Sequence, residues 1–267
     1  MTAEAAPAAL HLPPDTADTE RRFGGLRRLY GDAGYAQVRG AAVAVVGLGG
    51  VGSWAAEALA RSGVARLVLI DLDHVAESNI NRQVQALGAT LGQHKGLALR
   101  DRVADIHPAC EVQVVDAFVD AGNWPALLPG PVHAVIDACD QVRAKVAMAA
   151  WARAAGVSLV CVGAAGGKRA AQRVEVADLS EATHDPLLAS LRQRLRKEAG
   201  APRQGRLGVS CVFSREAVAG PADSCDSDGS LNCHGYGSSV TVTATFGMVA
   251  AGEALAQLIS KGDRAQA

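Results

Sequence analysis

Short runs of consecutive apolar residues alternate with segments of helical periodicity along the first part of the chain. The apolar runs predict strands at residues 41–46, 66–70, 111–116, 133–137 and 158–163. The segments between them predict helices at residues 53–62, 94–106, 123–128 and 143–155. Strands that are apolar throughout, rather than at alternate residues, are typical of a parallel sheet covered on both faces. The pattern therefore predicts an α/β fold with a Rossmann-like, doubly wound and mainly parallel sheet.

After residue 163 the pattern changes and predicts a C-terminal extension. Its elements are an edge strand at 174–176, a helix that begins at Pro186, a loop at 200–208, a strand at 209–213 and a loop at 220–237. Residues 1–20 are predicted to be disordered, and without a secretory signal they indicate a cytoplasmic protein. We expect one domain at 21–267, with a nucleotide-binding part at 41–165 and a substrate and dimer part at 166–262.

The segment 239–259 is about as long as a membrane span. Thr241, Glu253 and Gln257 interrupt its apolar character, and no basic flank precedes it. A closing helix between the sheet and a partner subunit explains these features better. We therefore expect a protein that does not span a membrane.

Charge is unevenly distributed along the 267 residues. The net charge is −1, but residues 168–206 carry nine Lys or Arg against five Asp or Glu. Aromatic residues make up only 4% of the chain, which argues against a base-stacking surface for single strands. No two of the six cysteines have C-x-x-C spacing, which excludes a zinc ribbon and a thioredoxin motif.

A glycine-rich turn joins the first predicted strand to the first predicted helix. Gly47, Gly49 and Gly52 match the dinucleotide-binding fingerprint, and Gly50 adds a further glycine. Bare backbone amides at a helix N-terminus favour phosphate, because the helix dipole attracts anions there. Asp71 follows the second strand, where a carboxylate can accept hydrogen bonds from ribose hydroxyls. The unit predicts a nucleotide-binding site without identifying the nucleotide.

Further polar residues follow the second strand. Asn79, Asn81, Arg82 and Gln83 form a cluster, and Lys95 begins the next helical pattern. Arg82 and Lys95 could neutralise a triphosphate, although either residue alone is also typical of a solvated surface charge.

Asp140 lies at the C-terminal end of a later predicted strand, where parallel sheets gather ligands. It is a candidate Mg²⁺ ligand, because Mg²⁺ prefers one or two carboxylates together with phosphate oxygens. The same residue could instead cap the following helix, and the two roles are compatible.

Taken in order, these motifs resemble those of the adenylating enzymes related to ubiquitin-activating enzymes, over about residues 20–260. The resemblance implies an ATP site made of Gly47, Gly49, Gly50, Gly52, Asp71, Asp73, Asn79, Asn81, Arg82, Gln83, Lys95 and Asp140. Asp71 would bind the ribose, Arg82 and Lys95 the phosphates, and Asp140 the Mg²⁺ ion. These last three residues are the expected catalytic set. The zinc-binding C-x-x-C pairs of the sulfur-carrier activators are absent, so no zinc is expected.

Four further stretches are similar to the tRNA threonylcarbamoyladenosine dehydratases, at residues 22–31, 49–61, 185–197 and 207–214. The similarity implies ATP-dependent cyclisation of the modified adenosine next to the anticodon. The substrate carboxylate would be adenylated, and a nitrogen or oxygen of the same substrate would then expel AMP. The alternative within the superfamily is an adenylyltransferase acting on the C-terminal glycine of a small sulfur-carrier protein.

The resemblance also implies a homodimer with a tRNA substrate. In sulfur-carrier activators an Arg of the N-terminal helix reaches the ATP of the partner subunit; Gly25 takes that position here, and Arg22 and Arg28 flank it. Cys233 matches a cysteine in a comparable loop of related enzymes, where it takes part in thioester or persulfide chemistry. The match allows a cysteine desulfurase or sulfur acceptor as a partner. The favoured interpretation is a loop cysteine without a role in cyclisation. The candidate tRNA-binding residues are Arg192, Arg194, Arg196, Lys197, Arg203 and Arg206.

Two other classes share part of this pattern. A nicotinamide-dependent dehydrogenase would use the glycine turn and Asp71, but the sequence lacks a Tyr-x-x-x-Lys pair. A dehydrogenase would also not explain why Arg82, Lys95 and Asp140 occur together. The second class is a non-catalytic, nucleotide-dependent RNA-binding module. Pyrophosphate release in the presence of substrate tRNA would distinguish an enzyme from such a module.

Overall fold

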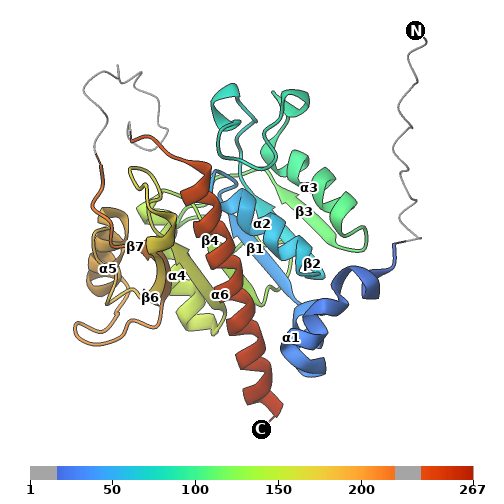
Figure 1. The fold of residues 1–267 in the computed structure, drawn as a ribbon. Coiled ribbons are helices and arrows are strands. Elements are labelled where there is room, and N and C mark those ends of the chain that lie inside the picture. Colours follow the sequence, from blue (N-terminus) through green and yellow to red (C-terminus); the bar gives the residue numbers. More distant parts are fainter. Residues whose placement is uncertain (1–16, 220–235, 267) are drawn as a thin grey trace.

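A seven-stranded sheet forms the centre of the computed structural model, which describes residues 17–219 and 236–266 (Figure 1). The strands are β1 (Ala42–Val46), β2 (Arg66–Ile70), β3 (Glu111–Val115), β4 (Ala134–Asp137), β5 (Ser158–Val162), β6 (Val174–Asp178) and β7 (Ser210–Ser214). Their order is β3-β2-β1-β4-β5-β7-β6, and only the β6–β7 pair is antiparallel. The order reverses between β1 and β4, where doubly wound sheets bind ligands beyond the carboxyl ends of the strands. The predicted fold class is confirmed.

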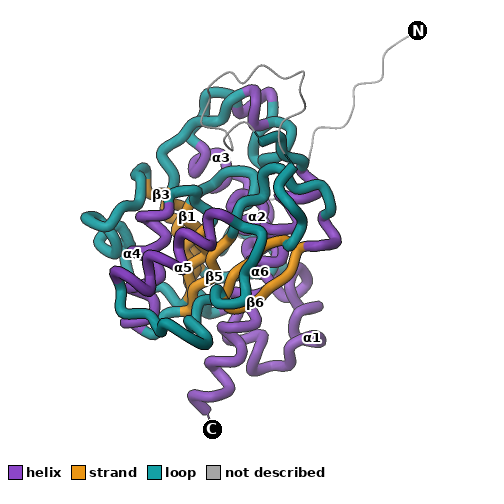
Figure 2. Tube along the Cα trace, turned by 90° about the vertical axis from the view of Figure 1, so that its left-hand side faces the viewer, coloured by secondary structure: helices purple, strands orange, loops and turns teal. Residues whose placement is uncertain are grey.

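Helices cover both faces of this sheet (Figures 1 and 2). They are α1 (Thr19–Arg39), α2 (Gly52–Arg61), α3 (Lys95–Ile106), α4 (Val142–Ala155), α5 (Pro186–Glu198) and α6 (Val240–Gln266). Side chains of α1, α2, α3 and α6 share one core with Val43 and Val45, whereas α4 and α5 share the other with Ala44 and Val46. Successive side chains of a strand point to opposite faces, so a sheet buried on both sides needs unbroken apolar strands.

Two helices begin where a carboxylate can accept a backbone amide. Asp18 Oδ1 accepts from Arg21 N at 2.9 Å, which starts α1. Asp185 Oδ1 accepts from Leu188 N at 2.9 Å, and Pro186 occupies the first turn of α5. Side-chain capping of this kind satisfies amides that have no partner inside the helix. The predicted disorder of residues 1–20 is wrong at its C-terminal end, because α1 already begins at Thr19 with Asp18 as its cap. Residues 1–16 lie outside the described residues, and the proposed domain limits stay a prediction.

The closing helix α6 lies across one face of the sheet (Figure 1). Its segment Val240–Gly262 is apolar and long enough to cross a membrane, but half of its most apolar window is buried inside the fold. Val242, Phe246 and Ala250 are fully buried. A Cβ on Gly247 would lie 2.4 Å from the Val51 carbonyl oxygen, so α6 packs directly on the start of α2. These contacts are those of a core helix.

The short helix predicted at 123–128 is wrong, because residues 121–127 form turns. Asp120 Oδ1 accepts from Gly122 N at 2.7 Å and from Asn123 N at 3.0 Å. Asn123 Oδ1 accepts in return from Asp120 N at 2.8 Å. Such local side-chain bonds compete with helical hydrogen bonds, and Pro125 has no amide to donate.

Candidate active site

The glycine turn of residues 47–52 joins β1 to α2 and packs against the chain that follows β4. Gly47 has a φ of +83°, and a Cβ there would lie 3.0 Å from the backbone of Ala138. A Cβ on Gly52 would lie 1.8 Å from the Gly47 carbonyl oxygen. By contrast, no described atom lies within 4 Å of the Cβ position of Gly49. The turn therefore needs glycine at its two ends for packing, while Gly49 between them faces open space that a phosphate could enter.

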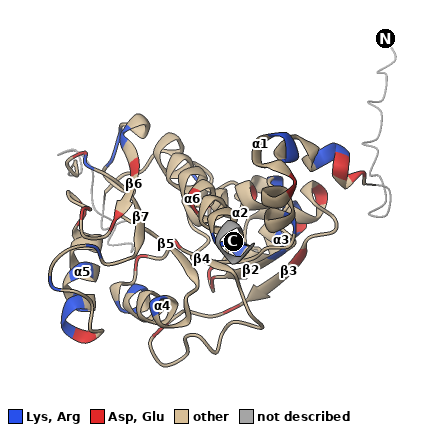
Figure 3. Cartoon of the chain, turned by 90° about the horizontal axis from the view of Figure 1, so that it is seen from below, with Lys and Arg blue, Asp and Glu red and all other residues tan. Residues whose placement is uncertain are grey.

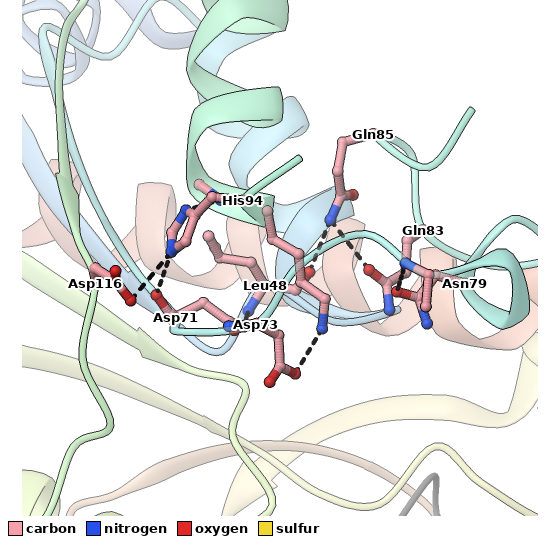
Figure 4. A network of polar contacts seen from close by, with 11 residues as sticks. Leu48, Asp71, Asp73, Asn79, Gln83, Gln85, His94 and Asp116 are labelled. Atoms are coloured by element: carbon pink, nitrogen blue, oxygen red, sulfur yellow. Dashed lines mark hydrogen bonds and ion pairs between the residues drawn. The ribbon is translucent and has the colours of Figure 1, made fainter. Parts of the chain in front are cut away.

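Asp71 connects the end of β2 to this turn (Figure 4). Its Oδ2 accepts from Leu48 N at 2.6 Å, and its Oδ1 accepts from Asp73 N at 2.8 Å. Two amide donors fix the orientation of the carboxylate at the mouth of the turn. Each carboxylate oxygen keeps a second lone pair, so Asp71 can also accept from hydroxyl groups of a ligand.

Lys95 begins α3 and is held at the same edge of the sheet. It is 6% exposed, and its Nζ lies 2.8 Å from Asp73 Oδ2. His94 caps α3, because its Nδ1 accepts from an amide of the first turn. Its Nε2 lies 3.1 Å from the Asp71 carbonyl oxygen and 3.4 Å from Asp116 Oδ1. His94 thus joins Lys95 to Asp71, a role that its place before Lys95 alone could not reveal.

Arg82 reaches the glycine turn from the polar segment after β2. Its Cγ lies 3.2 Å from the Cβ position of Gly50, so the aliphatic part of the side chain lies against the turn. The guanidinium donates to the Ser78 carbonyl at 2.6 Å and to Asn81 Oδ1 at 2.9 Å. The structure therefore brings Arg82 and Asn81 together beside the glycine turn.

Asn79 and Gln83 are buried and have contacts within the protein. Asn79 Oδ1 accepts from Ala76 N at 3.0 Å. Gln83 Oε1 accepts from Gln85 Nε2 at 3.1 Å, and the same Gln85 nitrogen lies 3.0 Å from the Leu48 carbonyl oxygen (Figure 4). Gln85 thus holds residues 83–85 against the glycine turn. Nothing in the sequence indicated this role for Gln85.

Asp140 is exposed in the chain between β4 and α4. Its alternative role as a helix cap is wrong, because Gln141 is the N-cap residue of α4 and makes no side-chain cap bond. Within the described part of the chain, the Asp140 carboxylate has neither a hydrogen bond nor an ion pair. It is therefore available to a ligand at the carboxyl edge of the sheet.

Asp137, the last residue of β4, and Lys145 on α4 form a fully buried ion pair. Lys145 Nζ lies 3.0 Å from Asp137 Oδ1 and donates to the carbonyls of Asp137 at 3.2 Å and Val162 at 2.8 Å. The thiols of Cys139 and Cys161 lie 3.1 Å and 3.4 Å from the two carboxylate oxygens. Burial opposes the charge of the ammonium, but its negative surroundings, Asp137 foremost, outweigh that effect and raise the pKa of Lys145. Burial also raises the pKa of both thiols, so they remain protonated at neutral pH.

The two candidate arginines of α1 differ in their contacts. Arg22 Nη1 donates to the carbonyls of Asp105 at 2.9 Å and Ile106 at 2.7 Å, at the C-terminal end of α3. Arg28 is exposed and has no such bond among the residues that the structure describes. Arg22 therefore ties α1 to α3, whereas the Arg28 side chain is exposed to solvent.

The predicted basic surface follows α5 and the loop after it (Figure 3). An open hollow of about 560 Å³ lies there, lined by Ala189, Arg192, Gln193, Arg196, Lys197 and Arg203. Four of its six lining residues are cationic.

Several of these basic side chains also hold the extension together. Arg192 Nη1 donates to the carbonyls of Leu179 and Ala182, at 3.1 Å and 2.7 Å. Arg196 Nε donates to the Pro202 carbonyl at 3.2 Å. In addition, Arg194 lies 3.5 Å from Glu198, and Arg206 lies 3.9 Å from Asp178. Lys197 and Arg203 have no such contact in the described segments.

Cys233 lies outside the described residues, so its role stays a prediction. Within residues 17–219 and 236–266, no group of three or more His, Cys, Asp or Glu side chains could hold a metal ion. A metal at Asp140 would therefore depend on oxygen ligands from a bound phosphate or from water.

A doubly wound sheet with a glycine turn, a carboxylate and two cations at its carboxyl edge is typical of nucleotide-binding α/β proteins. Residues 23–267 match the ThiF family, and the chain belongs to that family. It is 42% identical over 260 residues to the tRNA threonylcarbamoyladenosine dehydratase of Escherichia coli, covering 91% of this chain and 96% of that protein. The dehydratase of Haemophilus influenzae is 37% identical over 247 residues, covering 91% and 95%.

Solved structures show the same similarity. The E. coli tRNA N6-threonylcarbamoyladenosine dehydratase in complex with ATP superimposes with a TM-score of 0.83 at 41% identity, covering 93% of this chain and 98% of that one. Its complex with AMP gives a TM-score of 0.83 at 42% identity, covering 92% and 97%. The resemblance drawn from the sequence is confirmed.

Proposed function

We propose that the protein is an ATP-dependent dehydratase that cyclises N6-threonylcarbamoyladenosine in tRNA. One observation carries the proposal: the chain matches the E. coli dehydratase bound to ATP over nearly its whole length. The arrangement of Asp71, Lys95 and Arg82 beside the glycine turn, with exposed Asp140 at the same edge of the sheet, supports ATP as the nucleotide.

Within that proposal, each side chain has a defined task toward ATP. Asp71 accepts from the ribose hydroxyls, and the amides of the glycine turn receive phosphate oxygens. Lys95 and Arg82 neutralise phosphate charge, and Lys95 exchanges its bond to Asp73 for a phosphate oxygen. Asp140 fits Mg²⁺, because it is an exposed carboxylate without a partner in the described chain, and Mg²⁺ combines few carboxylates with phosphate oxygens. A bound Mg²⁺ ion would supply further charge neutralisation.

The chemistry needs an activated carboxylate. A substrate carboxylate oxygen attacks the ATP α-phosphorus, and the bond to pyrophosphate breaks. A nitrogen or oxygen of the same substrate then attacks the acyl carbon and expels AMP, so the substrate loses one water in total. The protein contributes positioning and charge neutralisation, and no enzyme nucleophile is required.

The tRNA would contact the basic hollow beside α5. Phosphate contacts position a nucleic acid without reading its sequence, and cationic side chains around an open hollow suit that task. Lys197 and Arg203 are the strongest candidates, because the other basic residues of this surface already contact groups of the protein.

We also propose a cytoplasmic homodimer in which Arg28 takes the position of the missing arginine toward the partner subunit. Leu29 beside it is 68% exposed, and Met248 on α6 is 42% exposed, so both helices present apolar surface that a subunit contact could cover. Arg22 is excluded from that role while it holds the end of α3.

The decisive experiment incubates tRNA bearing the threonylcarbamoyl group with the protein, ATP and Mg²⁺, followed by nucleoside digestion and mass analysis. The expected result is a modified adenosine lighter by one water, with AMP and pyrophosphate in equal amounts. Release of pyrophosphate only with a carrier protein that ends in glycine would favour the adenylyltransferase instead. No turnover with either substrate would contradict both.

A further inference from the structure

The buried pair Asp137–Lys145 lies next to the candidate ATP site, although neither residue faces open space. Both side chains are fully buried, whereas Asp140, three residues after Asp137, is exposed. An ion pair buried in the core is a poor source of stability, because removing two charges from water costs about as much as their attraction returns. Its presence at the end of a central strand therefore calls for another explanation.

The contacts of Lys145 supply one. Its ammonium bonds the carbonyl oxygens of Asp137 and Val162, which are the last residues of β4 and β5. These are neighbouring strands at the carboxyl edge of the sheet. The Lys145 ammonium thus joins the ends of β4 and β5, next to the segment that leads from β4 to Asp140.

Asp137 shapes that chain from the other side. Its Oδ1 lies 3.3 Å from Cys139 N, which bends the backbone immediately after β4. Ala138, inside this bend, donates its amide to Val46 O at 2.9 Å. The bend is also the backbone against which Gly47 packs, where a Cβ would lie only 3.0 Å away. The glycine turn and the segment leading to Asp140 therefore form one packed unit, and the ion pair contacts the backbone of that unit at Asp137 and Cys139.

We propose that Asp137 and Lys145 are positioning residues that set where Asp140 stands relative to the glycine turn, and thereby tune the Mg²⁺ requirement of nucleotide binding. The inference rests on the proposed role of Asp140 toward Mg²⁺ and phosphate. Residues that orient a metal ligand change metal affinity or activity by about 10- to 100-fold when they are replaced.

The test compares two double variants that leave no unpaired charge in the core. In D137N/K145M, the amide oxygen can still accept from Cys139 N, but the cation between β4 and β5 is lost. In D137L/K145M, the acceptor is lost as well, while the branched shape and the number of side-chain heavy atoms at position 137 are kept. Circular dichroism and urea unfolding establish that each variant is folded before any comparison.

Two binding measurements follow on the folded variants. Fluorescent ATP is titrated in EDTA and then at increasing Mg²⁺. We expect the affinity in EDTA to stay within about twofold, because the glycine turn and Asp71 remain. The Mg²⁺ concentration for half-maximal binding should rise about tenfold in D137N/K145M and more in D137L/K145M. Unchanged Mg²⁺ dependence in both variants would overturn the proposal, since a purely structural pair predicts that outcome.

Asp140→Asn, measured in parallel, separates this inference from the proposed function. If D140N leaves the Mg²⁺ dependence unaltered, the role of Asp140 itself is wrong. If D140N raises the requirement but the pair variants do not, only the positioning role fails.

Hydrogen exchange on the wild-type protein tests the shared packed unit, which the proposal requires, even if a variant does not fold. Adding Mg²⁺ to the ATP complex should slow exchange of the amides at 138–140 together with those at 47–52. Slowing confined to 47–52 would contradict a shared packed unit.

Discussion

His107 should make the protein sensitive to mild acid through the junction between α1 and α3. Its side chain is 1% exposed, and its Nε2 lies 2.9 Å from Arg39 Nη1, so the ring accepts from a cation. The ring centroid lies 4.7 Å from that of Phe23, and Nδ1 has no partner in the described structure. Burial, together with the positive charges of Arg39 and Arg22, lowers the pKa of His107 from 6.5 to about 4.

The direction of the effect follows from which state binds the proton. Between about pH 6.5 and pH 4, the unfolded chain holds a proton on this residue and the folded protein does not. The contribution of His107 to the free energy of unfolding is therefore fully present above pH 6.5. It is lost as the pH decreases toward 4. One pKa unit corresponds to about 1.4 kcal/mol, so the full loss from this residue is about 3 kcal/mol. That loss is a large fraction of the stability of an ordinary domain.

The matched control is His107→Gln, which keeps an acceptor for Arg39 but does not titrate. Urea unfolding of both proteins at pH 7 and pH 4 gives two differences in stability. We expect the wild-type protein to lose about 3 kcal/mol more than the variant, because other acid effects are shared and cancel. Equal losses in the two proteins would refute the reasoning, as would a wild-type protein that is more stable at pH 4.

Four further outcomes test the proposed function. Asp71→Ala should weaken ATP binding at least tenfold in isothermal titration, because the ribose loses its acceptor; unchanged affinity would remove Asp71 from the site. Replacing Lys197 and Arg203 by Glu should weaken tRNA binding and reduce the salt slope by about 0.7–0.9 per lost contact, with Arg100→Glu as the control on α3. An unaltered slope would contradict the tRNA surface. Cys233→Ser should keep cyclisation intact in the mass assay, since intramolecular attack needs no thiol; a folded variant that makes no product would indicate covalent catalysis. Light scattering at micromolar concentration should give the mass of a dimer, and a monomer would count against the subunit contact.

Much of the geometry of the candidate site could be predicted because it depends on local rules. A glycine turn between a buried strand and a helix requires backbone approach and positive φ, and Gly47 shows both. Polar residues at the carboxyl ends of parallel strands must meet at one edge, which brings Asp71, Lys95 and Asp140 to the same side of the sheet. The unbroken apolar strands likewise predicted a sheet covered on both faces.

Other features depended on contacts between segments far apart in the chain. The sequence offered Arg22 and Arg28 as equals, and only the packing of α1 on the end of α3 distinguishes them. The basic residues after Pro186 form one run in the sequence, yet the fold uses several of them to bind its own carbonyls and carboxylates. The burial of Lys145 could not be predicted, because a lysine inside an amphipathic helix is ordinarily solvated. Periodicity and motifs specify which backbone elements form and where strands end, whereas the partner of a long charged side chain is decided by tertiary packing, which alone determines the groups within its reach.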